Sequence, residues 1–454
     1  MRIPLLSLIA ALVAVPASLT PSALRADDLI QIYDLAVQSD PLLREAEQRL
    51  FATKEVRPQA LAPMLPNVGL QGTVDYKNVS AWGRAVTATG ERRREGYSDQ
   101  GAQAVLRQSV YNRGNWMTLK QTETVIAQAE AQYRNAQIDL MVRTTQAYFN
   151  VLQAADAVTV QEALVRADER QLEQSRQRFD VGLVAITDVN DSQAAFDRSK
   201  ANLITAKTVL DNAWEALRVI VGPIHVPLAR LGDKLPLAPP QPNEINVWAD
   251  SAQRNNYLII AASDAAASAK TNIEIQKSGF YPQLDLQAGY DISRSGAEFG
   301  TDSDTGFVGL TLTVPIYQGG AVASRTRQAG YNFRAAQDQL DQTRRQVDQQ
   351  VKNAFRGIQS SIEDVKARQA AVVSARSSLE STQAGLEVGT RTQVDVLNAQ
   401  RLLFQAEYDY LASRYVYIIN GVKLHQATST LSREVLAKGN AWLNPADKVA
   451  PPAY

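Results

Sequence analysis

Apolar side chains recur at steps of three and four residues along two very long stretches of the chain. Residues 115–181 contain neither Gly nor Pro and are rich in Ala, Gln, Glu, Arg and Leu, which favour helices. Residues 320–387 repeat the pattern. The apolar positions are Ile126, Ala129, Tyr133, Ala136, Leu140, Ala147, Val151, Ala154 and Val158, then Leu340, Val347, Val351, Ala354, Ile358, Ile362, Val365 and Val372. This spacing predicts two helices with coiled-coil-like seams, each about 100 Å long at 1.5 Å per residue.

Helices of this length exceed the core of any single globular domain, so we expect them to lie side by side in an elongated bundle or tube. Their seam positions are often Ala, Ser or Gln and rarely Leu. Small seam residues let helices pack closely and leave a broad, weakly apolar face. Such a face suits a helix in a tube wall, with neighbours on two sides and water on a third.

Four shorter stretches alternate apolar with polar residues, at about 67–79, 101–110, 283–293 and 305–314. In the first, the apolar or small positions are Val68, Leu70, Gly72, Val74 and Tyr76. A strand of about ten residues with one apolar and one polar face is typical of a membrane barrel with a wet interior. A soluble antiparallel hairpin with one face on a core fits the strands about equally well.

The chain also repeats itself. Residues 62–71 match 278–287, and Val181-Gly182-Leu183 matches Val388-Gly389-Thr390, with further matches in the same order between them. This order predicts an internal duplication. Each repeat consists of a helix, two strands, a very long helix, a turn and another helix. The turns are expected at 182–187 and 389–394.

Prolines mark the boundary between the repeats. Six of the 18 prolines lie between positions 223 and 242. We therefore place the first repeat at 27–222, a Pro-rich connection at 223–247, the second repeat at 248–432 and a C-terminal tail at 433–454. The tail from Ala441 onward is expected to be loosely ordered.

The first 26 residues are typical of a signal peptide. Residues 3–24 are apolar or small, one basic residue, Arg2, precedes them, and no acidic residue interrupts them. Pro16 and Pro21 break the apolar run, which is too short to span a bilayer as a helix. We therefore expect an exported chain, and export favours the barrel interpretation of the strands.

Composition excludes several classes of function. The 47 basic and 47 acidic residues balance, which argues against nucleic acid as a partner. The absence of cysteine excludes disulfides, thiol catalysis and a lipid-modified N-terminal Cys. With only two histidines, His225 and His425, a histidine-based zinc site is disfavoured. We expect no cofactor, no metal and no enzyme activity.

Four strands cannot close a barrel, because barrels begin at about eight strands. The chain would therefore have to pool its strands with copies of itself. Two copies give eight strands and three give twelve. The residues favour an oligomer and leave its number open.

Several segments together resemble the TolC family of outer-membrane efflux proteins. They are residues 177–189, 388–397, 147–152 and 314–320, and the similarity extends from about Leu29 to Leu431. The resemblance implies an α+β membrane protein: a homotrimer with a twelve-stranded outer-membrane barrel, a mixed equatorial region and a periplasmic helical tube. It implies an exit duct for multidrug efflux and type I secretion, in contact with outer-membrane lipid. A periplasmic adaptor and an inner-membrane pump or ABC transporter would be its partners.

The resemblance also assigns roles to the two turns, which would form an iris at the periplasmic end. Residues that would contact the adaptor are Val181, Gly182, Leu183, Val388, Gly389 and Thr390. A plain helical turn with a glycine cap explains the two glycines equally well. Thr187 and Asp188 match positions that bind an Arg of a neighbouring helix, and Arg391 matches that Arg. An ordinary surface ion pair is the alternative.

Two positions depart from the family pattern. Leu386 stands where the family has a latch Tyr, so one hydrogen bond is missing. Asn398 stands where a second aspartate ring would be, which leaves Asp395 as the matched ring carboxylate. Three copies of Asp395 around a narrow axis would still attract cations. The departures predict a leakier closed state and weaker block by divalent cations.

Two other classes of protein are alternatives to the duct. A periplasmic coiled-coil adaptor or scaffold would also be exported and helical, but it would not contain a duplicated chain with four amphipathic strands. An exported hydrolase would need acidic residues converging on a pocket. No such group stands out in the sequence.

Overall fold

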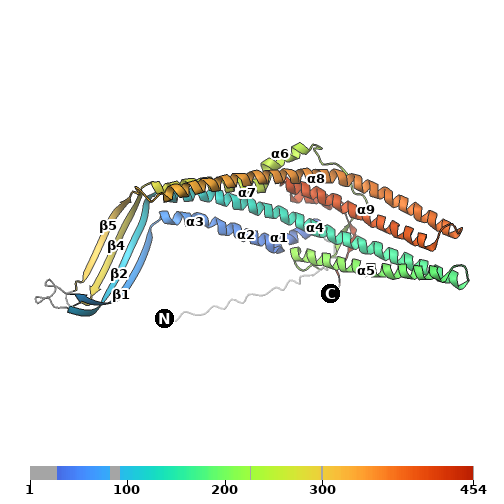
Figure 1. Cartoon of the computed structure of the whole chain (residues 1–454), viewed down its shortest axis with the longest axis horizontal. Helices are drawn as coiled ribbons and strands as arrows, with labels where there is room; N and C mark the ends of the chain where they lie inside the picture. The colour runs from blue at the N-terminus through green and yellow to red at the C-terminus, as the bar shows by residue number, and fades with distance from the viewer. Residues whose placement is uncertain (1–27, 82–92, 225, 298–299, 453–454) are drawn as a thin grey trace, which may run out of the picture.

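The computed structural model describes residues 28–81, 93–224, 226–297 and 300–452. The predicted signal peptide and His225 lie outside the described residues. The chain is elongated, with a sheet at one end, two helical turns at the other and a mixed region between them (Figure 1). No helix in the described part of the chain combines the length and apolar character needed to cross a bilayer.

The sheet contains four antiparallel strands, one hairpin from each repeat. They are β1 (Asn67–Ala81), β2 (Arg93–Asn112), β4 (Gln283–Ser295) and β5 (Ser303–Thr313). Their order is β1-β2-β4-β5, so the two repeats meet where β2 pairs with β4. All four predicted strands are confirmed, although β2 begins eight residues earlier than expected because Arg93–Gln100 pairs with Val74–Ala81.

The register confirms the two faces of the sheet. Val68 pairs with Leu106, Leu106 with Ala288, and Ala288 with Val308, which makes one apolar row across all four strands. Directly paired residues point to the same face of an antiparallel sheet. Val68 is 69% exposed and Val308 is 75% exposed, so nothing in the described chain covers this face.

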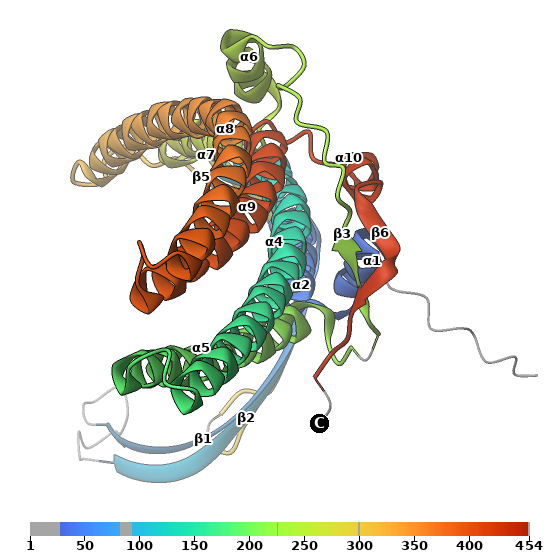
Figure 2. The same cartoon turned by 90° about the vertical axis from the view of Figure 1, so that its right-hand side faces the viewer.

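The very long helices are also confirmed. They are α4 (Arg113–Asp180) and α8 (Ala321–Glu387), of 68 and 67 residues. Each turns back into a shorter partner, α5 (Ile186–Val221) or α9 (Gln393–Ala427). Seen end on, the two hairpins lie along a curved layer, with α4 and α9 as neighbours at its centre (Figure 2). The curvature fits a segment of a tube wall.

The helices that precede the strands are broken where single helices were expected. The first repeat has α1 (Leu29–Ser39), α2 (Pro41–Lys54) and α3 (Val56–Leu61), and the second has α6 (Ile245–Asn255) and α7 (Tyr257–Lys277). Side chains cap the breaks before α2 and α7, whereas the break between α2 and α3 has no side-chain cap. Asp40 accepts a 2.8 Å hydrogen bond from the Leu43 amide, and Asn256 accepts one of 2.8 Å from the Leu258 amide.

Residues 433–449 of the C-terminal tail form a helix and a strand, which corrects the expectation of a loose tail. Helix α10 (Arg433–Asn440) leads into β6 (Leu443–Val449), which pairs with β3 (Leu228–Leu231) inside the Pro-rich connection. Leu443 and Val449 are buried at the two ends of β6. This antiparallel pair packs against the middle of α4, where the Tyr148 hydroxyl donates a hydrogen bond of 2.8 Å to the Ala229 carbonyl.

The hydrophobic core lies in the same middle region, where the two hairpins pass each other. Tyr148, Phe149 and Trp214 are fully buried there. The Tyr148 and Phe149 rings meet edge to face at 5.5 Å, and Phe149 lies 5.9 Å from Tyr415 of α9. This aromatic cluster joins α4 of the first repeat to α9 of the second.

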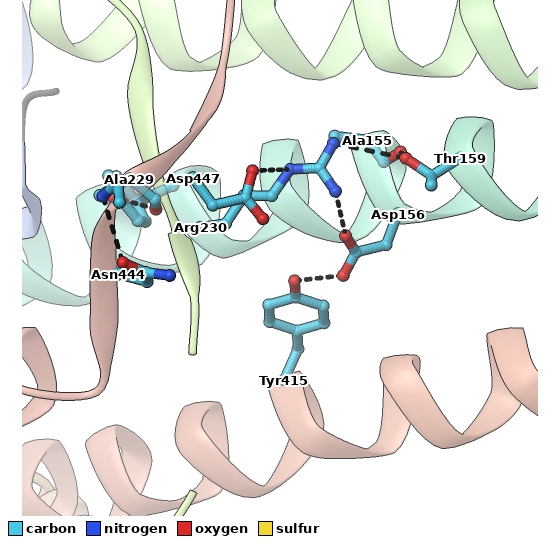
Figure 3. Close-up of polar contacts among 10 residues, drawn as sticks. Ala155, Asp156, Thr159, Ala229, Arg230, Tyr415, Asn444 and Asp447 are labelled. Atoms are coloured by element: carbon cyan, nitrogen blue, oxygen red, sulfur yellow. Dashed lines mark hydrogen bonds and ion pairs between the residues drawn. The ribbon is translucent and has the colours of Figure 1, made fainter. Parts of the chain in front are cut away.

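Polar contacts reinforce this junction (Figure 3). Tyr415 donates a hydrogen bond to one oxygen of Asp156, and Arg230 of β3 lies 3.2 Å from the other. Arg230 also reaches Asp447 of β6 at 3.5 Å. The pKa of Asp156 is raised by burial, while the hydrogen bond from Tyr415 and the charge of Arg230 oppose that rise. The β3–β6 strand pair is thereby connected to both long helical hairpins.

Candidate functional site at the helical tip

The first turn at the tip is built around a left-handed glycine. Gly182 has φ of 75°, and its amide donates to the Phe179 carbonyl at 2.8 Å. The Leu183 amide donates to the Arg178 carbonyl at 2.8 Å, which completes the end of α4. This bonding satisfies carbonyls that the last turn of a helix leaves free. Val181 and Leu183 project into solvent beside the glycine.

The second turn has the same design. Gly389 has φ of 80°, and the Thr390 amide donates to the Gly385 carbonyl at 2.8 Å. Val388 is 74% exposed, as Leu183 is in the first turn. The sequence repeat is therefore also a structural repeat. All six predicted docking residues lie exposed at one end of the chain.

Asp395 has a local role that the sequence prediction missed. Its carboxylate accepts hydrogen bonds of 2.9 Å from both the amide and the hydroxyl of Thr392, and its own amide donates to the Thr392 hydroxyl. This is a capping box at the start of α9. These hydrogen bonds lower the pKa of Asp395, so the carboxyl stays ionised at neutral pH. The sequence pattern that could have predicted this capping role is a Thr three residues before an acidic residue.

The predicted latch residues are not brought together within one chain. Asp188 lies in the first turn of α5, where the helix dipole favours a carboxylate. Arg391 lies beside Gly385, where an added Cβ would fall 2.7 Å from the Arg391 Cγ. In the described part of a single chain, Asp188 and Arg391 form no ion pair with each other.

The remaining predicted residues lie close to these turns. Thr187 is exposed in the first turn of α5, and Asn398 is exposed on α9. Leu386 is half-buried in the last turn of α8, where its carbonyl accepts from the Gly389 amide at 3.2 Å. A leucine side chain has no hydrogen-bonding group to offer at this place.

A cavity of about 230 Å³ lies between the two hairpins just above the turns. Its lining comes from α4, α5 and α9 and includes Asp168, Asp191, Arg198, Asn398 and Arg401. Only Asn398 of these was singled out from the sequence. No group of His, Cys, Asp or Glu in the described residues is arranged to hold a metal ion.

Comparison with known proteins agrees with this architecture. The family model described as "Outer membrane efflux protein" matches residues 32–223 and 248–430. The chain belongs to the outer membrane efflux protein family. The two matched segments correspond closely to the two repeats and leave out the connection between them.

Curated relatives of the efflux family cover most of the chain. The outer membrane protein TolC of Escherichia coli K12 is 37% identical over 437 residues, which is 93% of this chain and 86% of that protein. The alkaline protease secretion protein AprF of Pseudomonas aeruginosa is 26% identical over 403 residues, covering 87% of this chain and 83% of its own length. The expected family resemblance is confirmed.

A solved structure supports the fold of this efflux protein. The CmeC outer membrane channel of Campylobacter jejuni superposes with a TM-score of 0.76 at 14% identity, covering 96% of this chain and 98% of that one. The chain is an α+β outer-membrane efflux channel. The family is one of transport proteins and not of enzymes, which leaves the adaptor and hydrolase alternatives without support.

Proposed function

We propose that three copies of this chain form one exit duct for drug efflux and type I secretion. The observation that carries the proposal is the open sheet. Both β1 and β5 are edge strands, and one face of the sheet is apolar and uncovered in the described chain. Exposed edges are closed when sheets join into a barrel. Three four-stranded sheets would give a twelve-stranded barrel in the outer membrane, continued by the helical hairpins as a periplasmic tube.

The two turns are proposed as the docking surface for a periplasmic adaptor that brings an inner-membrane pump. Val181, Leu183 and Val388 place three exposed apolar side chains at the end of the hairpins. Apolar side chains held by tight glycine turns offer a rigid surface to a partner. The similarity to TolC and to a protease secretion protein supports both an efflux and a secretion role.

The iris would be closed by contacts between neighbouring chains. Asp188 and Arg391 form no ion pair with each other within the described part of one chain, so we assign their pairing to adjacent copies in the trimer. Thr187 would share the same Arg. An Arg–carboxylate bond is directional and breakable, which suits a contact that opens and closes. Exposed pairs of this kind contribute about 0–1 kcal/mol each.

Asp395 is proposed as the acidic ring of the aperture. Its capping contacts with Thr392 hold the carboxylate at the start of α9 in its ionised form. Three ionised copies around one axis would attract cations. Asn398, one helical turn along, adds no charge to this ring.

Complementation tests the proposed function. The chain would be expressed in a bacterium that lacks its own efflux channel, with drug susceptibility and export of a type I substrate as readouts. We expect restored drug resistance and restored secretion. Leu183→Asp should lose both while remaining in the outer membrane, whereas Arg345→Gln, exposed on α8, should behave like the unaltered chain. Outer-membrane protein without either activity would overturn the proposal.

A further inference from the structure

A buried hydrogen bond joins the two hairpins of one chain above the turns. Gln400 of α9 donates through Nε2 to Asp168 Oδ1 of α4 at 2.7 Å. Asp168 and Gln400 are each 4% exposed, although the solvent-facing surfaces of α4 and α9 are largely polar. The contact links the first repeat directly to the second.

A second polar contact lies closer to the turns. Gln393 of α9 donates to the Ser192 hydroxyl of α5 at 3.1 Å and accepts from Gln171 of α4 at 3.2 Å. Ser192 is fully buried and also contacts Ser175 at 3.0 Å. We call Asp168, Gln400, Gln171, Gln393 and Ser192 the inter-hairpin clasp.

Asp168 is the one ionisable member of the clasp. The charged residues lining the cavity beside it are Asp191 and Arg198 of α5 and Arg401 of α9. None of them forms an ion pair with Asp168 in the part of the chain that the structure describes. An ionised carboxylate buried without a cation is unfavourable compared with the same group in water.

We infer that the clasp is an interior closing contact of each chain, which breaks when the α8–α9 hairpin moves away from the α4–α5 hairpin, and that protonation of Asp168 tightens it. This inference rests on the proposed function as a gated duct. Separation of the hairpins would let water reach Asp168 and would remove its bond from Gln400. The ionised form therefore favours separation, and the protonated form favours the closed arrangement.

The sign of the pH effect follows from burial. Burial raises the pKa of Asp168 in the closed arrangement, and hydrogen bonds from Ser199 and Gln400 oppose this rise without cancelling it. In the open arrangement the carboxyl would be hydrated and its pKa would return toward the ordinary value of about 3.9. The closed arrangement thus binds the proton more tightly, so acidification favours closure and neutral pH favours opening.

The clasp differs from the exposed turn residues in how it responds to solvent. Exposed ion pairs are screened by water and salt, whereas Asp168 and Gln400 are buried and the clasp contains no ion pair among the described residues. Raised salt should therefore weaken contacts such as Asp188–Arg391 and leave the clasp unchanged.

Channel recordings in planar bilayers test the inference. The full-length protein and its variants would be recorded between about pH 4 and pH 7, a range that brackets ordinary and raised carboxyl pKa values. Asp168→Asn imitates the protonated carboxyl, so we expect low conductance at every pH, equal to that of the unaltered channel in acid. Gln400→Ala removes the bond, and we expect an open fraction about fivefold higher. Because the two variants move conductance in opposite directions, misfolding cannot imitate both.

Two control variants separate Asp168 from other acidic groups. Asp191→Asn changes an exposed carboxyl of the same cavity and should leave the pH profile unchanged. Asp395→Asn removes the proposed acidic ring and should leave the Asp168-dependent part of the profile in place. If the Asp168→Asn channel has the same pH profile as the unaltered channel, this inference is overturned and the proposed function is not. Absence of any channel from the unaltered protein would overturn the proposed function as well.

Discussion

The Tyr415 hydroxyl donates a 2.5 Å hydrogen bond to Asp156 Oδ2, and this bond joins the last long helix of the second repeat to the first long helix of the chain. Arg230, on β3 of the β3–β6 strand pair, lies 3.2 Å from the other carboxylate oxygen of Asp156. Figure 3 shows Asp156 between Arg230 and Tyr415. The junction lies beside the buried aromatic cluster of Phe149 and Tyr415, and the two hairpins extend from it to the turns. It can therefore act as a fixed point about which the hairpins move.

Removal of the Tyr415 hydroxyl tests this fixed point. Tyr415→Phe leaves the ring in the aromatic cluster and takes away one donor from a buried carboxyl. We expect the free energy of unfolding to fall by about 1–3 kcal/mol, the usual effect of leaving a buried polar group unsatisfied. Tyr331→Phe, on the exposed surface of α8, is the matched control and should change stability little. Equal stability of the two variants in denaturant titration would contradict the assignment.

The two turn glycines should resist substitution for a conformational reason. An added Cβ at Gly182 or Gly389 would meet no atom within 4 Å, so only the positive φ opposes alanine. We expect each substitution to destabilise its turn by about 1–2 kcal/mol. Gly330→Ala, in mid-helix with equally open surroundings, should instead stabilise α8 by up to about 1 kcal/mol. Thermal unfolding would show opposite shifts; shifts of the same sign would refute this explanation.

The capping box gives a pH prediction. Hydrogen bonds from Thr392 lower the pKa of Asp395 in the folded chain. The stabilising contribution of Asp395 is therefore present above the unfolded pKa of about 3.9 and is lost as pH falls through the lower folded value. Thr392→Ala should return the pKa of Asp395 toward the ordinary value and weaken the start of α9 by about 1 kcal/mol. Carboxyl titration by NMR of the hairpin region in the assembled protein measures the first effect. Thr382→Ala, near the end of α8, should leave the titration of Asp395 unaltered.

Leu386 predicts a leaky closed state. Restoring a hydroxyl with Leu386→Tyr would supply the hydrogen bond that the leucine cannot make, and the aperture should close more tightly. Cells carrying the variant should be less sensitive to vancomycin than cells carrying the unaltered channel. Equal vancomycin sensitivity at equal expression would argue against a leak at this position.

Cation block should depend on the number of carboxylates near the aperture. With Asp395 as the proposed ring, we expect weak block by divalent cations in bilayer recordings. Asp395→Asn should abolish the block, and Asn398→Asp should strengthen it, because a second ring adds charge close to the first. If neither variant changes the block by divalent cations, Asp395 does not line the ion pathway.

Local patterns predicted most of this fold. Helices α4 and α8 were placed within two residues at each end, because helix periodicity and turn glycines are properties of neighbouring residues. The pairing of β3 with β6 was missed because its partners lie more than 200 residues apart and each strand is short. Only the folded chain brings such segments together.

The tip was predicted unevenly for the same reason. Both glycine turns and their exposed apolar residues follow from the repeat in the sequence. The clasp does not, because Asp168 and Gln400 look like ordinary surface positions on polar helices. Their burial depends on how the two hairpins are placed, which no local pattern encodes.

The proposed duct is shared by three chains and embedded in the membrane. It is tested most directly by the mass of the protein extracted in detergent from separated outer membranes, by light scattering with the detergent contribution subtracted. We expect a particle of about three mature chains in the outer-membrane fraction. A monomer that stays soluble in the periplasm without detergent would contradict it.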